Sequence, residues 1–290
     1  MHPASSVIIF STLSGAGFGL LAWIGLGFAP VTGWTAFWYF VLAYVLAVGG
    51  LLASTFHLGH PERALKAFSQ WRSSWLSREG ISAVATLLVM AVYGAGLVFF
   101  EQILVPLGVL GAAGALFTVL TTAMIYTQMK TVPRWRHWTT PVLFLTLAVT
   151  GGAISGGLRV TAMVLLALSC AVQLVWWLLA KDRFARSTTT IATATGLGAG
   201  TRQFSAPHTG TNYLLKEMVH VVGRRHAVRL KGVALLLGFV LPFILLALCS
   251  GVWVSLAAGA LHLVGVFASR WLFFAEAEHV VGLYYGRPQI

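Results

Sequence analysis

The chain has 290 residues, of which 58% are hydrophobic and only 9% are charged. A soluble globular protein carries roughly a quarter charged residues, so this composition excludes a water-soluble domain and indicates an integral membrane protein. The net charge of +12 does not indicate a nucleic-acid-binding protein, because the basic residues lie in loops between apolar segments. In that position they orient the chain in the lipid bilayer and attract anionic headgroups.

Eight apolar segments have about the ~20 residues that a helix needs to cross a bilayer. The first is longer than the core of a signal peptide and is expected to be retained. The sequence therefore predicts an all-α bundle that forms a single membrane domain over residues 1–290. The predicted spans are Val7–Ala29, Trp34–Phe56, Gly80–Phe100, Leu104–Gln128, Thr140–Gly157, Val160–Ala180, Gly232–Ser250 and Val252–Phe274.

The Lys and Arg residues lie almost entirely on one side of these spans. Four are in the loop after the second span, three after the fourth, nine in the long loop 181–231 and one in the C-terminal tail. The other side holds Arg159 alone, and Arg270 falls within the last span. By the positive-inside rule, both termini and the basic loops are predicted to be cytoplasmic, in a bacterial inner membrane.

The long loop divides into two parts. Ser187–Gly210 is rich in Thr, Gly, Ala and Ser and is predicted to be flexible. Asn212–Leu230 can form an amphipathic helix that either lies on the membrane surface or covers a partner. Within the spans, Gly15–Gly19 and Gly152–Gly156 have the four-residue spacing that lets helices approach closely, although glycine is common in such helices in any case.

The loop after the second span holds the densest set of ionisable residues. His57 ends that span and Glu79 directly precedes the next, so a short loop is expected to bring the two side chains together. An imidazole and a carboxylate at the membrane boundary suit proton-coupled reduction of a quinone, whose oxygens need hydrogen-bond partners. The alternative is a cluster of interfacial ion pairs that only anchors the helices.

A second set of polar residues follows one face of the last span. His262, Ser269 and Glu276 are seven residues apart, and Glu276 with His279 has the Glu-x-x-His spacing of di-iron bundles. Such a centre needs two copies of that motif, so a di-metal site is not predicted. His262 has no evident partner histidine inside another span, so haem is not expected. The two cysteines, Cys170 and Cys249, cannot hold an iron–sulfur cluster.

Several tryptophans flank the predicted spans. Trp71 and Trp75 lie in the loop after the second span, and Trp135 and Trp138 in the loop after the fourth. We interpret them as interfacial belts, with stacking on a quinone ring as the alternative.

Short motifs along nearly the whole chain resemble the membrane-anchor subunits of dimethyl-sulfoxide-reductase-type molybdoenzymes, the DmsC family. They are His2-Pro3 before a Ser/Thr/Gly-rich first span, His57-Leu58-Gly59 with Pro61 and Arg63-Ala64, Leu76-Ser77-Arg78-Glu79, Thr131-Val132-Pro133 with Trp135, and Arg270.

The resemblance implies a three-part complex. A molybdopterin subunit and an iron–sulfur subunit hold the cofactors, and the anchor exchanges electrons with a quinone, ubiquinone or menaquinone, usually without haem. It also implies that His57 and Glu79 form the quinone and proton-transfer site. Arg270, Arg63 and His60 are assigned to the same site.

The predicted orientation refines what the resemblance implies. In the familiar dimethyl sulfoxide reductases the catalytic subunits dock outside the cytoplasm, on the side of the His-Leu-Gly loop. Here that loop is predicted to be cytoplasmic, which resembles the branch of the family that oxidises sulfite in the cytoplasm. The leading hypothesis is a sulfite dehydrogenase anchor that reduces quinone between the second, third and last spans. The alternatives are a quinol-oxidising anchor of an S- or N-oxide reductase, a transporter and a purely structural anchor.

Overall fold

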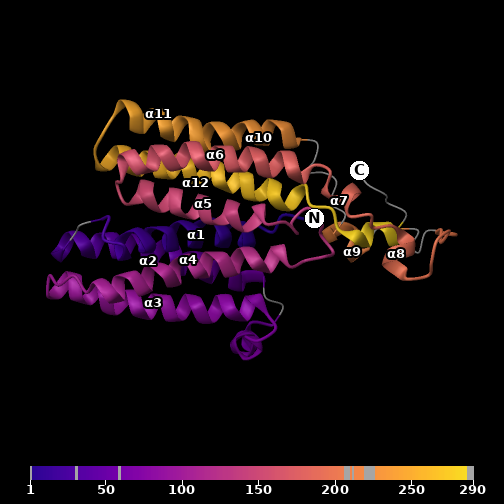
Figure 1. Ribbon diagram of the computed structural model, residues 1–290, viewed down its shortest axis with the longest axis horizontal. Helices are drawn as coiled ribbons and strands as arrows, with labels where there is room; N and C mark the ends of the chain where they lie inside the picture. Colours follow the sequence, from indigo (N-terminus) through magenta and orange to yellow (C-terminus); the bar gives the residue numbers. More distant parts are fainter. Residues whose placement is uncertain are drawn as a thin grey trace.

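The computed structural model describes residues 2–29, 32–57, 60–205, 210, 212–218 and 226–285, without the side chains of His57 and Pro61. Within these residues, long helices lie side by side in one bundle (Figure 1). They are α1 Ser5–Gly25, α2 Gly33–Ala53, α3 Trp75–Phe99, α4 Val105–Thr127, α5 Thr139–Ser155, α6 Arg159–Ala180, a composite helix of α10 Ala227–Leu235, η4 Leu236–Val240 and α11 Leu241–Leu248, and α12 Val252–Ala275.

The predicted all-α membrane class is confirmed. Seven of these helices are long and apolar enough to cross a membrane, and α5 is a shorter apolar helix of 17 residues. The largest differences from the predicted bounds are at two helix starts. Helix α3 begins at Trp75 rather than Gly80, and α10 begins at Ala227 rather than Gly232. The first turns of both helices contain charged residues, and a search for apolar segments assigns such residues to the loop.

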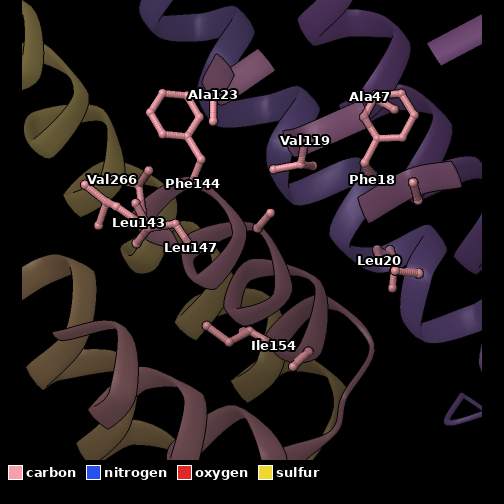
Figure 2. Packing of buried hydrophobic residues seen from close by; sticks show 14 of the residues in the cluster. Phe18, Leu20, Ala47, Val119, Ala123, Leu143, Phe144, Leu147, Ile154 and Val266 are labelled. Atoms are coloured by element: carbon pink, nitrogen blue, oxygen red, sulfur yellow. The ribbon is translucent and has the colours of Figure 1, made fainter. Parts of the chain in front are cut away.

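Helix α1 is the centre of the bundle, because it packs against α2, α4, α5 and α12. Helices α1 to α4 form one half of the bundle, and α5, α6, α10, α11 and α12 form the other (Figure 1). Figure 2 shows the apolar core between the halves, where Phe18 of α1, Val119 of α4, Phe144 of α5 and Val266 of α12 pack together. Neighbouring helices therefore bury α1 on most sides.

Two of the predicted small residues make the closest contact between the halves. A methyl group added to Gly19 would lie 1.9 Å from the Ala148 carbonyl oxygen, and one added to Gly152 would lie 2.2 Å from the Gly19 carbonyl carbon. Gly15 and Gly156 are less crowded, with nearest neighbours at 3.9 Å and 3.1 Å. Close approach of helices α1 and α5 thus requires one glycine from each predicted pair.

One end of the bundle carries the loops rich in Lys and Arg, and we call it the basic end. Short helices cover part of it: α7 Arg183–Arg186, α8 Ile191–Thr195, α9 Tyr213–Met218 and the 3₁₀ segment η5 Val280–Tyr285 (Figure 1). Tyr284 donates to the Ala194 carbonyl at 2.8 Å, and the His2 amide donates to the Glu217 carbonyl at 2.7 Å. The chain's first residues, the long loop and η5 therefore meet at this end.

Helix α9 covers only the beginning of the amphipathic helix predicted over Asn212–Leu230. Val221, Val222, Arg224 and Arg225 lie outside the described residues. The last residues of the predicted segment belong to α10, which is part of the seventh long helix.

Candidate functional site

The loop after α2 is held against the start of α3. It contains two 3₁₀ segments, η1 Ser54–His57 and η2 Pro61–Gln70. The Ser77 hydroxyl donates to the Ala67 carbonyl, and the Phe68 ring lies against Gly80, where an added methyl group would be 3.2 Å away. The Arg78 guanidinium donates to the Trp71 carbonyl at 2.9 Å. These contacts pack η2 on the first turns of α3.

Glu79 lies inside α3, in its second turn, and not before the third span as predicted. Ser74 caps the helix by accepting from the Ser77 amide at 3.4 Å, so the helix includes both Arg78 and Glu79. Only 4% of Glu79 is exposed. The Thr122 hydroxyl of α4 donates to its carboxylate. The carboxylate is therefore a buried group between two helices.

Further hydroxyl groups continue this polar interface between α3 and α4. Ser82 lies 3.4 Å from Thr121, and Thr86 lies 3.5 Å from Thr118, measured between side-chain oxygens. These residues were not among those predicted from the sequence. The spacing of Thr118, Thr121 and Thr122 within an apolar segment is the signal that could have indicated a polar helix face.

Arg270 lies in α12 with 3% of its surface exposed. Its guanidinium carbon is 3.4 Å from the centre of the Phe144 ring, a cation–π contact. No hydrogen bond or ion pair to Arg270 occurs within the described part of the chain. Arg270 and Thr122 line the same small cavity, and Thr122 also donates to Glu79, so Thr122 links the two predicted residues.

That cavity has a volume of about 20 Å³. A single water molecule needs ~10–15 Å³ by the same measure, so the cavity is far too small for a quinone headgroup.

His60 and Arg63 lie apart from the buried carboxylate. Both contact Glu62 within η2, His60 at 2.9 Å and Arg63 at 3.8 Å, and about two thirds of each side chain is exposed. The backbone of His57 closes η1 at the end of α2, while its side chain lies outside the described atoms. The predicted contact between His57 and Glu79 remains a prediction.

The polar residues along the last span contact four different neighbours and do not meet in one site. The His262 Nδ1–H donates to the Gly238 carbonyl at 2.6 Å, and the Ser269 hydroxyl donates to Gln173 at 2.6 Å. Glu276 pairs with Arg134 at 2.5 Å and with Lys231 at 2.6 Å. No group of three or more His, Cys, Asp or Glu side chains suited to a metal occurs within residues that the structure describes.

Trp135 is a core residue, which corrects its assignment to an interfacial belt. Only 2% of it is exposed, and its ring is stacked on Phe273 with 5.1 Å between centres. Its indole nitrogen donates to the Phe273 carbonyl at 2.9 Å. The ring and the N–H group are thus engaged inside the protein, so Trp135 cannot stack on a quinone. Trp71 and Trp138 are 51% and 65% exposed, as expected of belt residues.

A larger hollow of about 940 Å³ lies at the opposite end of the bundle from Glu79. It is mostly apolar and is lined by the start of α2, the connection between α5 and α6, and the connection between α11 and α12. Trp38 and Leu42 contribute apolar surface, and Arg159 is its charged group. By size it lies within the range of small-molecule sites, so it must be considered as a competing place for a quinone.

The comparisons with known proteins agree with the resemblance found in the sequence. Residues 2–274 match the family described as DMSO reductase anchor subunit (DmsC). The chain is 32% identical to a subunit of the sulfite dehydrogenase of Allochromatium vinosum over 325 aligned positions, which cover 98% of this chain and 99% of that protein. No solved structure matches it. The chain is therefore a multi-pass membrane protein that belongs to the DmsC family of DMSO reductase anchor subunits.

Proposed function

We propose that this chain anchors a three-subunit sulfite dehydrogenase in the membrane and passes its electrons to ubiquinone or menaquinone. Its partners in this proposal are an iron–sulfur subunit and a molybdopterin catalytic subunit. Similarity to the sulfite dehydrogenase protein of Allochromatium vinosum over nearly the full length of both chains supports this assignment. The observation that carries the quinone assignment is the Glu79 carboxylate, which is buried in α3 and hydrogen-bonded by Thr122.

The distribution of charge supports a cytoplasmic position for the basic end. All but two of the 19 Lys and Arg residues belong to its loops, its helix ends or the C-terminal tail, and this excess is typical of the cytoplasmic side. The termini and both soluble partners are then cytoplasmic. Electrons and protons both reach the quinone from that side, so its reduction separates no charge across the membrane.

The proposed mechanism assigns separate roles to the residues around α3. A quinone takes up two electrons and two protons, and each of its oxygens needs a hydrogen-bond partner. The His57 imidazole donates to one oxygen and passes on a proton, a role for which histidine is the usual residue. Glu79 supplies protons from inside the bundle. Arg270 lines the cavity that Thr122 also lines and is proposed to place a positive charge near this proton path.

The exposed residues His60 and Arg63 are proposed to serve the entry of protons. His60 directly precedes η2 and Arg63 lies in it, and both contact Glu62 at the surface. Arg63 stays positively charged there, beside the exposed His60 and Glu62 through which water reaches the site.

The test uses the complete complex in vesicles with two substitutions at this site and one at the other hollow. His57→Gln and Glu79→Gln should abolish sulfite-linked quinone reduction while sulfite oxidation with an artificial dye continues. Arg159→Gln should leave both activities intact. The opposite pattern, with quinone reduction lost only in Arg159→Gln, would place the quinone at the opposite end of the bundle. A membrane potential formed during turnover in oriented vesicles would contradict the proposed side of proton uptake.

The main alternative is a quinol-oxidising anchor of an S- or N-oxide reductase, which the description of the matched family favours. The identity of the substrate resides in the catalytic subunit. A twin-arginine export signal on that subunit, or reduction of an S-oxide by quinol in the purified complex, would select this alternative.

A further inference from the structure

Three buried polar atoms around the small central cavity have no hydrogen-bond partner. They are Oγ1 of Thr12, Nε2 of His262 and Nε of Arg270, and all three residues line the cavity. The residues are at most 3% exposed. Buried polar groups in proteins nearly always have a partner, so three unpaired atoms around one cavity indicate that a polar ligand belongs there.

The size and lining of the cavity indicate which ligand. Its volume of about 20 Å³ exceeds the ~10–15 Å³ that one water molecule requires and excludes a lipid or a quinone. The hydroxyl-bearing residues Ser11, Ser14 and Thr122 also line it. A bound water molecule needs two to four polar partners, and this lining offers them.

The state of His262 is determined by its other ring nitrogen. Nδ1 lies 2.6 Å from the Gly238 carbonyl oxygen, which can only accept, so Nδ1 carries a proton. In the neutral ring, Nε2 is then an acceptor that faces no donor of the protein. The nearby Leu147 carbonyl also can only accept, so it can bond to Nε2 only when that nitrogen is protonated. Nε2 therefore needs either a water molecule or a proton.

The Gly238 carbonyl is available to His262 because of a local irregularity in the seventh long helix. Pro242 has no N–H group, so the α-helical bond from residue 242 to the Gly238 carbonyl cannot form. The segment Leu236–Val240 is a π-helix, an irregularity that is frequent at functional sites. Gly265 of α12 packs directly on Gly238, since a methyl group added to Gly265 would lie 2.1 Å from the Gly238 Cα. This close packing positions His262 against the irregular segment.

We propose that the cavity binds a water molecule that bridges Thr12, Arg270 and Nε2 of His262, and that His262 is a proton acceptor in the middle of the membrane. When Glu79 is protonated it can donate to the Thr122 hydroxyl in turn, and a hydrogen-bonded chain then leads from its carboxyl through that hydroxyl and the water to His262. A proton leaves Glu79 and one arrives at Nε2, while each hydroxyl or water between them gives up one proton as it accepts another.

The members of this hydrogen-bonded chain lie at different distances from the basic end, so the chain leads into the interior of the bundle. Glu79 is near the start of α3, whereas His262 lies about 20 Å from the end of α12 at the basic end, given 1.5 Å per residue. Arg270 is the charged side chain among the described residues that line the cavity. Glu79 does not line it but is hydrogen-bonded to Thr122, which does. Tyr126 lies within electrostatic reach of both Glu79 and Arg270. This site requires no quinone, so it is independent of the proposed function.

The test reads water and proton access directly in the complete complex without turnover. A cryo-electron microscopy map that resolves ordered water should show one peak at ~2.7–3.2 Å from Nε2 of His262 and Oγ1 of Thr12. Exchange of the carbon-bound imidazole hydrogen with deuterium, followed by mass spectrometry, should be measurable at His262 because that reaction needs water at the ring. An empty cavity in such a map, a peak with the contacts of an anion, or a His262 that does not exchange would overturn the proposal.

Two isosteric substitutions supply the comparison. Thr12→Val removes a hydroxyl without a protein partner and keeps its volume, so it should weaken the water peak and slow exchange at His262 several-fold. Thr146→Val removes a hydroxyl that bonds to the Val142 carbonyl of its own helix at 2.9 Å, away from the cavity, and should leave exchange unchanged. Equal exchange rates in the two variants would also overturn the proposal.

Discussion

The Thr122 hydroxyl of α4 donates a hydrogen bond to the Glu79 carboxylate of α3, inside the bundle and near its basic end. It is the only side-chain hydrogen bond to that carboxylate within the described residues. The orientation of the carboxylate therefore depends on one hydroxyl group.

Replacing Thr122 with Val should lower quinone-linked turnover about tenfold or more, because a hydrogen bond to a charged group contributes ~1.5–3 kcal/mol. Thr122→Ser keeps the hydroxyl and should stay close to the original rate. The measurement is quinone reduction compared with dye reduction in the same preparation. Thr127→Val, which removes a hydroxyl bonded to the Ala123 carbonyl at 2.9 Å, is the matched control. Unchanged quinone turnover in Thr122→Val would show that the bond has no role.

The ion pair between Arg134 and Glu276 should contribute strongly to stability. The two side chains are 10% and 12% exposed, and Glu276 also pairs with Lys231. Glu276→Gln removes the carboxylate that these two positive charges share, and loss of one partner of a buried pair costs ~3–5 kcal/mol. The free energy of unfolding should fall by an amount toward the lower end of that range.

The exposed pair of Asp182 and Arg186 serves as the control for this prediction. Its charged atoms are 3.8 Å apart and both side chains are more than half exposed. Asp182→Asn should change the free energy of unfolding by only ~0–1 kcal/mol. Denaturant titrations of both variants in the same detergent give the comparison, and equal losses would contradict the assignment.

Gly152→Ala should disrupt the contact between α1 and α5. The added methyl group would lie 2.2 Å from the Gly19 carbonyl carbon, so the two helices must separate. Overpacking of this kind costs ~1–3 kcal/mol, and the midpoint of thermal unfolding should fall accordingly. Gly49→Ala meets no atom within 4 Å and should be neutral or raise the midpoint slightly, since alanine favours a helix over glycine. A loss in Gly49→Ala as large as that in Gly152→Ala would argue against close approach as the cause.

His137 should make the protein less stable in mild acid. Burial lowers its pKa below the ordinary 6.5, and the positive charge of Arg183 lowers it further. Above about pH 6.5 the imidazole is neutral in both the folded and the unfolded chain, so it contributes no pH dependence. As pH falls below that value, the unfolded chain binds the proton first, and the free energy of unfolding decreases until the folded imidazole is protonated too.

His137→Gln should therefore reduce the loss of stability as pH falls below about 6.5. The measurement is the unfolding midpoint in denaturant at several pH values for the original chain and the variant. Because His137 is only half-buried, the expected change is small, and its direction is what tests the prediction. A steeper loss in the variant would contradict it.

The sequence by itself determined the class of the protein and the approximate position of every long helix. Hydrophobic length is a local property, and a bilayer imposes it on each span separately, so segments such as Leu104–Gln128 could be predicted to within a residue or so at each end. The charge distribution and the family resemblance are also properties of the linear chain. The start of α3 was missed because capping by Ser74 extends a helix through charged residues, which an apolar-segment criterion ignores.

Contacts between distant residues were decided only by the tertiary structure. Trp135 has the sequence position of a belt residue, yet stacking on Phe273, 138 residues later, buries it. Thr122 does not stand out in an apolar sequence, and His262 stands out only as one polar residue on a helix face. They acquire a role because α4 and α12 place them beside Glu79 and beside a cavity. The physical reason is that a hydrogen bond or a cavity depends on the relative position of several helices, which the periodicity of one helix does not contain.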